Sequence, residues 1–281
     1  VPMFFVLSGF LISGLFFNRY SGNKPVSAKR FLLRRAFKIY PSFYIFILIS
    51  IGLAEFMPYV QFGWKQILSE CIFVQNYWVP MWQNTWSLGV EEHFYFAIAM
   101  VAWLFYRYAK TTFISNHIGK IIILGYLGFL GIRWGFALAH LNEAKHYFTQ
   151  THLYMDSILL GIFGSYLNHK YREKVKSIFD NYRWVFIALA TGFAVPTFFF
   201  APGSFLTNSI GMTCLHLSCV LWVLISIHND RRIKFPGRNA IVGTISFVGL
   251  HSYTIYLWHI VVKHLTYHQG LDDWLKWTLY F

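Results

Sequence analysis

Charged residues are scarce in this sequence. Only 12% of the 281 residues are Asp, Glu, Lys or Arg, whereas 56% are hydrophobic. An average soluble domain has about 25% charged residues, so this chain has about half of the charge that a surface in water requires. The high hydrophobic content also excludes an intrinsically disordered chain. The composition therefore predicts a membrane protein.

Cysteine is rare as well, and two common catalytic motifs are missing. Three cysteines in 281 residues exclude a disulfide-based scaffold. No G-x-S-x-G elbow surrounds Ser8, so Ser8 and Gly9 favour close helix packing over a catalytic serine. No H-E-x-x-H motif accompanies His264 and His268, and their spacing alone does not indicate a metal site.

The sequence starts at Val1 and stops at Phe281, in each case within an apolar run. No charged segment precedes the first run and no small-residue cleavage site follows it, so we do not expect this run to be a cleaved signal peptide. We expect residues 1–281 to form a single transmembrane domain that is truncated at both ends.

Apolar stretches near the length of a membrane span recur along the chain, with short linkers between them. They predict an all-α fold, a polytopic bundle of transmembrane helices with about eight complete spans. No internal repeat or low-complexity tract interrupts the pattern. The predicted spans cover residues 1–17, 39–57, 86–106, 121–139, 151–168, 184–201, 205–227 and 241–262, and a ninth begins near 274.

The net charge is +13, from 24 Lys and Arg against 11 Asp and Glu. Nineteen of the 24 cations lie in four alternate loops, which are 18–38, 107–120, 169–183 and 228–240. Basic loops resist translocation, so these four loops are predicted to be cytoplasmic. A nucleic-acid-binding protein would instead gather its cations on one exposed face of a soluble fold. The distribution argues against nucleic acid as a partner.

Few ionisable side chains lie inside the predicted spans, and such groups usually face the protein interior or a water-filled cavity. Glu91 and Glu92 point about 100° apart on a helix and cannot both face one site. Tyr95 shares a face with Glu91, because the two are four residues apart. Two interpretations of Glu91 stay open: a carboxylate that orients a base or binds a polar substrate, and a structural ion pair with a buried arginine such as Arg133.

A basic segment precedes the second predicted span. Arg35 and Lys38 are three residues apart and can point the same way, and Arg34 is adjacent. This cluster suits a phosphorylated ligand, and it also fits the more common basic anchor at anionic headgroups. His259, at the outer end of the eighth span, is typical of an interfacial residue, with binding of a polar acceptor as the alternative.

Six segments of the chain form an ordered pattern. They are Phe4–Ile12, Arg34–Pro41, Gln75–Tyr77, Trp86–Tyr95, Thr151–Gly161 and Ser252–His259. The pattern resembles the acyltransferase 3 family of integral membrane acyltransferases, the type that O-acetylates bacterial surface polysaccharides. The resemblance covers nearly the whole chain.

The resemblance implies a domain of roughly ten helices in the bacterial cytoplasmic membrane. It would pass an acyl group, expected to be acetyl, from cytoplasmic acyl-CoA to a hydroxyl of a cell-envelope or exported glycan. Arg34, Arg35 and Lys38 would hold the acetyl-CoA, and Glu91 would orient a catalytic histidine.

Further roles follow from the chemistry of such a transfer. Charge develops on the thioester carbonyl, and Tyr95 and Arg133 are the candidates for stabilising it. On the substrate side the candidates are Glu92, Asp156 and His259.

Three departures from the family pattern stand out. The family's catalytic histidine precedes the first motif, so this chain lacks it, and we expect the chain alone to be inactive. Lys38 stands where arginine is usual and loses the bidentate fork. Tyr154 stands where many members have arginine, which leaves Asp156 without its expected neighbour.

Two other classes remain as alternatives. In a polytopic transporter, the buried Glu, Arg and Asp side chains would line a solute path, and an internal repeat would be expected. In a scaffold for a partner enzyme, the same polar residues would be purely structural.

Overall fold

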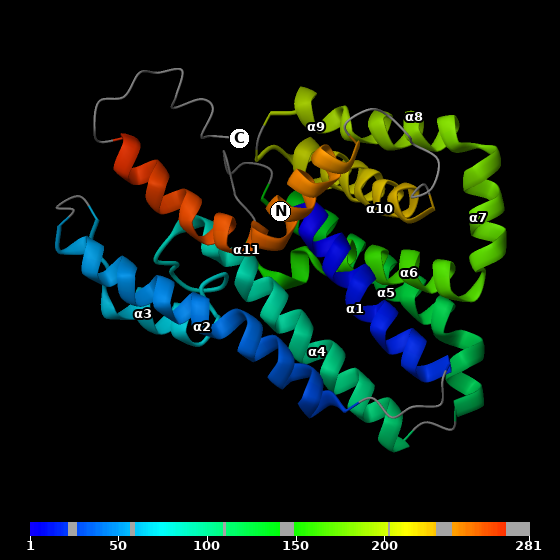
Figure 1. Cartoon of the computed structure of the whole chain (residues 1–281), viewed down its shortest axis with the longest axis horizontal. Coiled ribbons are helices and arrows are strands. Elements are labelled where there is room, and N and C mark those ends of the chain that lie inside the picture. Colours follow the sequence, from blue (N-terminus) through cyan, green and yellow to red (C-terminus); the bar gives the residue numbers. More distant parts are fainter. Residues whose placement is uncertain are drawn as a thin grey trace. The chain divides into compact units, whose positions relative to one another are not determined.

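The structure, a computed structural model, describes residues 1–21, 27–56, 60–108, 111–140, 149–201, 203–228 and 238–267. Within these ranges every regular element is a helix and no strand occurs, which confirms the all-α prediction (Figure 1). The longer helices are α1 (Pro2–Ser21), α2 (Ala28–Ala54), α4 (Trp86–Tyr108), α5 (Thr111–Ala139), α6 (Met155–Lys170), α10 (Met212–His228) and α11 (Arg238–Tyr267). The shorter elements are α3 (Trp64–Cys71), η1 (Gln83–Thr85), η2 (Thr151–Leu153), α7 (Arg172–Asn181), α8 (Arg183–Ala194), α9 (Pro196–Phe199) and the π-helical η3 (Thr207–Gly211).

Several of these helices are long and apolar enough to cross a membrane, so the chain is a polytopic membrane protein. The five segments are Pro2–Arg19, Ala28–Ala54, His117–Ala139, Thr207–His228 and Val242–His264. The other three predicted spans correspond to α4, the 16-residue α6, and α8 with α9. The count of eight spans therefore remains a prediction.

The linkers contain helices that the apolar pattern did not predict. Helix α3 lies in the linker after the second predicted span, and α7 lies in the basic loop 169–183. Both are short and rich in polar residues, so neither produces an apolar run of membrane length. The predicted ninth span, His268 and most of the basic loop 228–240 lie outside the described residues.

The chain divides into two compact units, and the single domain expected from the sequence remains a prediction. Unit 1 comprises Val1–Phe31 and Val90–Ile233, and unit 2 comprises Leu32–Gly89 and Lys234–Phe281.

Unit 1 is built around a close crossing of α1 and α6. A Cβ atom at Gly9 would lie 2.2 Å from the carbonyl oxygen of Ile158, and one at Gly161 would lie 2.1 Å from that of Val6. Both obstacles are main-chain atoms, so only glycine fits at these two positions. This is the close helix packing that Gly9 indicated in the sequence.

The helix ends that adjoin the basic loops meet at one end of unit 1. Phe17 of α1 and Gly119 of α5 both lie against Tyr166, near the C-terminal end of α6. Helix α7 follows directly, and its Phe179 stacks on His228 at the end of α10, with ring centroids 5.7 Å apart. These ends of α1, α5, α6 and α10, each next to a basic loop, are therefore grouped within unit 1, as positive-inside topology requires. Their cytoplasmic location remains a prediction.

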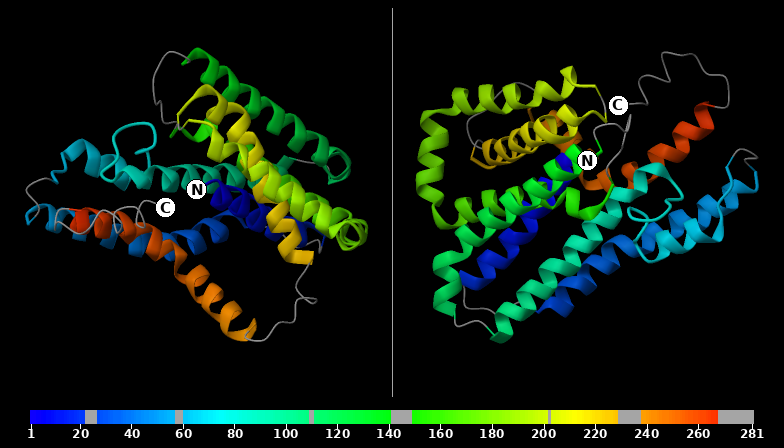
Figure 2. Two further views of the ribbon diagram at one scale, coloured as in Figure 1. Left: turned by 90° about the horizontal axis from the view of Figure 1, so that it is seen from above. Right: turned by 180° about the vertical axis from the view of Figure 1, so that it is seen from behind.

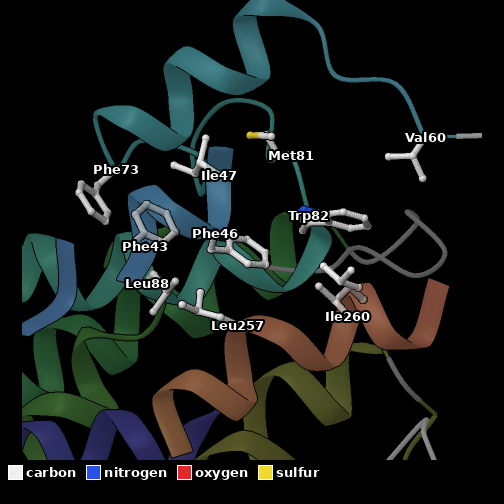
Figure 3. Close-up of a cluster of buried hydrophobic side chains, with 11 residues drawn as sticks. Phe43, Phe46, Ile47, Val60, Phe73, Met81, Trp82, Leu88, Leu257 and Ile260 are labelled. Carbon is white, nitrogen blue, oxygen red and sulfur yellow. The ribbon is translucent and has the colours of Figure 1, made fainter. Parts of the chain in front are cut away.

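Unit 2 has an aromatic core formed by α2, the segment 60–88 and α11. Phe43 of α2 stacks on Phe73 with ring centroids 4.9 Å apart, and the Trp82 indole N–H donates to the Ser50 hydroxyl at 2.9 Å. Figure 3 shows the side chains of this cluster in close-up. Its buried residues are Phe43, Phe46, Ile47, Val60, Phe73, Met81, Trp82, Leu88, Leu257, Ile260 and Val261.

Candidate functional site

Glu91 lies in the second turn of α4, in unit 1, and both of its carboxylate oxygens have hydroxyl neighbours. The Tyr95 hydroxyl donates to Oε2 at 2.9 Å, and the Ser8 hydroxyl lies 3.4 Å from Oε1. Tyr95 is buried, and its ring meets Phe31 edge-on with centroids 6.3 Å apart. The contacts join the first and fourth motif segments. They hold a half-buried carboxylate in a fixed orientation, in which it can accept a proton or a further hydrogen bond.

Glu92 occupies a different environment from its neighbour. It is only 4% exposed, whereas Glu91 is half-buried, which agrees with the 100° offset of adjacent residues on a helix. The next residue, His93, places Nδ1 at 2.6 Å from the Thr151 hydroxyl. Helix α4 therefore also joins the fourth motif segment to the fifth.

Arg133 of α5 is almost fully buried and forms an ion pair with Asp156 of α6. Its Nε and Nη2 donate to Oδ2 of Asp156 at 3.0 and 2.8 Å. Nη2 also donates to the Thr213 hydroxyl at 2.7 Å, and Nη1 donates to the carbonyl oxygens of Asn208 and Ser209 in η3. All five N–H groups of the guanidinium are thus engaged.

The engagement of Arg133 decides one of the open alternatives. Its partners come from α6, η3 and α10. The interpretation that Glu91 forms a structural ion pair with Arg133 is therefore wrong. In this arrangement Arg133 keeps no N–H donor for a thioester oxygen. A role in stabilising the developing charge would require the network around it to open.

Asp156 does have an arginine partner, which the sequence did not suggest. Tyr154 stands where many family members have arginine, and its buried ring packs against Phe5 with centroids 5.2 Å apart. Arg133 supplies the guanidinium from another helix. His216 of α10, which is 1% exposed, places Nδ1 at 3.4 Å from Oδ2 of Asp156. Asp156 therefore connects three helices.

The predicted CoA-binding cations lie in the first half of α2, in unit 2. Arg34 and Lys38 are exposed and one helical turn apart, and Arg35 is half-buried. Just beyond them, the Tyr253 hydroxyl of α11 lies 3.4 Å from the carbonyl oxygen of Ile39. The second and sixth motif segments therefore meet in unit 2.

The fourth motif segment also reaches the sixth. The Asn84 side-chain amide donates to the Tyr256 carbonyl oxygen at 3.1 Å, and the hydroxyls of Ser87 and Tyr256 lie 2.6 Å apart. His259 stays outside this junction: its ring is exposed and Nδ1 lies 2.6 Å from the Tyr256 carbonyl oxygen. This exposure leaves Nε2 of His259 accessible to an acceptor.

Glu70 of α3 is a buried acid that the sequence analysis missed. It is 1% exposed, and Oε1 accepts from the Met81 backbone N–H at 3.0 Å and from the Thr85 hydroxyl. Burial raises the pKa of the Glu70 carboxyl to about 7, against hydrogen bonds that lower it. An acidic residue between predicted spans is expected to face water. The only sequence signal for burial of Glu70 is its position close to the Gln75–Tyr77 motif.

These observations define a polytopic membrane protein in which residues of the motif segments form hydrogen bonds with Glu91 and Asp156 belongs to a buried ion pair. The acyltransferase 3 family, described as an acyltransferase domain, matches the chain over residues 1–281. The chain belongs to this family, which confirms the resemblance found in the sequence.

The relatives of this chain are named as O-acetyltransferases. A presumed O-acetyltransferase of Staphylococcus aureus (strain COL), SACOL0978, is 26% identical over 314 residues, which cover 100% of this chain and 48% of that protein. O-acetyltransferase OatA of S. aureus (strain NCTC 8325) is 26% identical over 301 residues, covering 96% of this chain and 47% of OatA. No solved structure matches the chain.

The chain spans about half the length of the curated relatives that it matches. The part of these relatives that aligns with the chain is therefore the acyltransferase domain.

Proposed function

We propose that this chain is the membrane domain of an enzyme that moves an acetyl group from cytoplasmic acetyl-CoA to a hydroxyl of a cell-envelope or exported glycan. The bacterial cytoplasmic membrane is the expected location. Family membership and the O-acetyltransferase names of the relatives support the reaction class. The single observation that carries the residue assignment is the Glu91 carboxylate, which is held by the hydroxyls of Tyr95 and Ser8.

The donor side of the proposal rests on the basic segment of α2. Arg34 and Lys38 are exposed, and a guanidinium and an ammonium one turn apart fit the phosphates of a CoA nucleotide. Lys38 binds as a point charge rather than through a planar fork, so Arg35 and Arg34 would supply the directional hydrogen bonds.

The reaction balances without any redox partner. The acceptor oxygen forms a new bond to the acyl carbon, the carbon–sulfur bond of the thioester breaks, and the hydroxyl proton leaves through a base and ends on the CoA sulfur. We assign Glu91 to orienting that base, because the hydroxyls of Tyr95 and Ser8 hold its carboxylate in one orientation. The Tyr95 hydroxyl donates its proton to the Glu91 carboxylate. It would donate toward the reacting centre only after that hydrogen bond is released.

The test is acetylation of cell-envelope glycan by the full-length protein in a bacterial host. Arg35→Ala should weaken acetyl-CoA binding, which is read out as protection of the basic loops by bound acetyl-CoA. Glu91→Gln should lower acetyl transfer to glycan while leaving that protection intact. Lys65→Ala and Glu55→Gln serve as matched controls, because both residues are exposed and remain outside the proposed site. Unchanged acetyl-CoA protection in Arg35→Ala would contradict the donor assignment.

The same experiment separates the transferase from the transporter and scaffold alternatives. Neither a solute carrier nor a scaffold needs acyl-CoA at its cytoplasmic loops. Absence of acetyl-CoA protection in the unmodified protein would therefore contradict the transferase proposal as a whole.

A further inference from the structure

Helix α7 lies at the end of unit 1 where α1, α5, α6 and α10 come next to basic loops. The segment Arg172–Asn181 is bent by 87° from the segment Arg183–Phe199 that follows it. Figures 1 and 2 show α7 as the corner between α6 and α8. Helix α8 packs along the membrane-length α10, where the Ser218 hydroxyl donates to the Ala190 carbonyl oxygen at 2.6 Å. If α8 follows the direction of a span as α10 does, the bend of 87° places α7 along the membrane surface.

One side of α7 is packed against the protein. Val175 and Phe179 contact the buried apolar cluster of unit 1, and Phe179 stacks on Phe186 with ring centroids 4.2 Å apart. Arg172 and Lys176 are exposed, and both are near enough to His228 of α10 to act on it electrostatically. These contacts fix which way the helix is turned.

The adjacent side of α7 is apolar but uncovered. Tyr171, Ile178 and Tyr182 are 41%, 48% and 59% exposed. Lys174 lies three residues after Tyr171 and four before Ile178, so it belongs to the same flank. Among the described residues no hydrogen bond or ion pair engages Lys174. An apolar flank bordered by a cation is typical of a helix that lies at a bilayer surface.

Cations and aromatic rings also meet at both ends of α7. Nζ of Lys170 lies 5.4 Å from the ring centroids of Tyr166 and Tyr171 and donates to the Tyr166 hydroxyl at 3.0 Å. The Arg183 guanidinium lies 5.9 Å from the ring centroid of Trp184, which is 77% exposed. Such pairs anchor a protein at headgroup depth, where the ring is in lipid and the cation meets phosphate.

We propose that the surface formed by Lys174 and Ile178 of α7, together with Lys170, Tyr171 and Tyr182 next to its two ends, binds the headgroups of anionic phospholipids in the cytoplasmic leaflet. The ammonium groups match the phosphodiester, and the apolar side chains match the acyl-chain boundary beneath it. A soluble phosphate would satisfy only the cations and would leave Ile178 and both tyrosines in water. This surface is separate from the proposed acyl transfer and does not depend on it.

The test is lipid retention by the purified full-length protein, measured by native mass spectrometry after exchange with phosphatidylglycerol or phosphatidylcholine. Lys174→Gln should weaken phosphatidylglycerol binding about fivefold, the fold-change equivalent to about 1 kcal/mol for one cation near an anionic surface. Lys176→Gln is the matched control, because it removes the same charge from the other flank and should leave binding unchanged. Lys174→Arg should retain binding.

The competing outcomes are distinct. Equal loss in Lys174→Gln and Lys176→Gln, or loss in neither, would overturn the proposal. Comparable binding of soluble glycerol phosphate would overturn the assignment to a bilayer headgroup. Should Lys174→Gln fail to fold, Lys170→Gln tests the same flank. None of these readouts measures acetyl transfer, so failure here leaves the proposed function standing, and the reverse also holds.

Discussion

The two units each bury an acidic side chain, but with different kinds of partner. In unit 1, Asp156 pairs with Arg133 across two helices, and a third helix supplies Thr213 to the same guanidinium. In unit 2, Glu70 accepts hydrogen bonds from a main-chain N–H and from the Thr85 hydroxyl, and none of the described residues gives it a cationic partner. The carboxylate of unit 1 is therefore ionised, whereas burial raises the pKa of the Glu70 carboxyl in unit 2 to about 7, so that this group is about half protonated at pH 7.

This difference shows two separate uses of a buried acid. Asp156 connects elements that are far apart in sequence, so its contribution depends on assembly of three helices. Glu70 binds Met81 and Thr85 of the adjoining segment and orders the chain just before α4 begins. We expect unit 1 to be sensitive to loss of a charge, and unit 2 to be sensitive to pH.

The largest expected effect comes from breaking the ion pair of unit 1. Asp156→Asn leaves Arg133 as an uncompensated buried charge and should cost about 3–5 kcal/mol of unfolding free energy. The measurement is unfolding in mixed micelles, followed by tryptophan fluorescence. The double variant Arg133→Met, Asp156→Leu removes both charges and should recover most of the loss. A cost below about 1 kcal/mol for Asp156→Asn would contradict the ionic role.

The next effect concerns the pH dependence of unit 2. The folded-state pKa of Glu70 is raised from 4.5 to about 7, so the neutral carboxyl stabilises the protein. That contribution is complete below about pH 4.5 and is lost as the pH rises through about 7, with a size of about 3 kcal/mol. Glu70→Gln should remove this dependence from unfolding curves measured between these pH values. The exposed Glu55→Gln should retain it, and identical pH profiles in Glu70→Gln and the unmodified protein would refute the assignment.

A smaller effect is expected at the crossing of α1 and α6 in unit 1. Gly161→Ala places a Cβ atom 2.1 Å from the Val6 carbonyl oxygen and should cost about 1–3 kcal/mol, because main-chain atoms must move. Gly128→Ala in α5 meets no atom within 4 Å and should instead stabilise by up to about 1 kcal/mol. Thermal unfolding of both variants in detergent checks the contrast. The pH response assigned to Glu70 should survive in Gly161→Ala, because Glu70 lies in unit 2 and Gly161 lies in unit 1.

The smallest effect is expected at His216. Its Nδ1 is 3.4 Å from Asp156, and its Nε2 is buried without a hydrogen-bond partner among the described residues. His216→Leu loses a weak contact and also removes an unsatisfied polar atom, so the two terms nearly offset and the change should be below about 1 kcal/mol. The same unfolding assay measures it. A cost as large as that of Asp156→Asn would make His216 a full member of the ionic network.

Much of the fold and part of the candidate site could be predicted from local patterns. Apolar runs predicted a helical membrane protein, and the four-residue spacing predicted that Glu91 and Tyr95 share a face. Glu70 and α3 were missed, because a short polar segment between apolar runs is expected to be a solvated loop. The partner of Asp156 was missed because Arg133 is 23 residues away on another helix. Spacing predicts contacts only within one helix.

The sequence by itself determined the helices, their membrane character, the alternation of basic loops and membership of the acyltransferase 3 family. These properties depend on composition, on the 3.6-residue period and on motif order, which are all local or additive. Only the tertiary structure decided that Arg133 belongs to Asp156 and not to Glu91, and that Glu70 is buried. Those pairings depend on where helices cross, and glycines such as Gly9 and Gly161 permit a crossing without specifying the polar partners beside it.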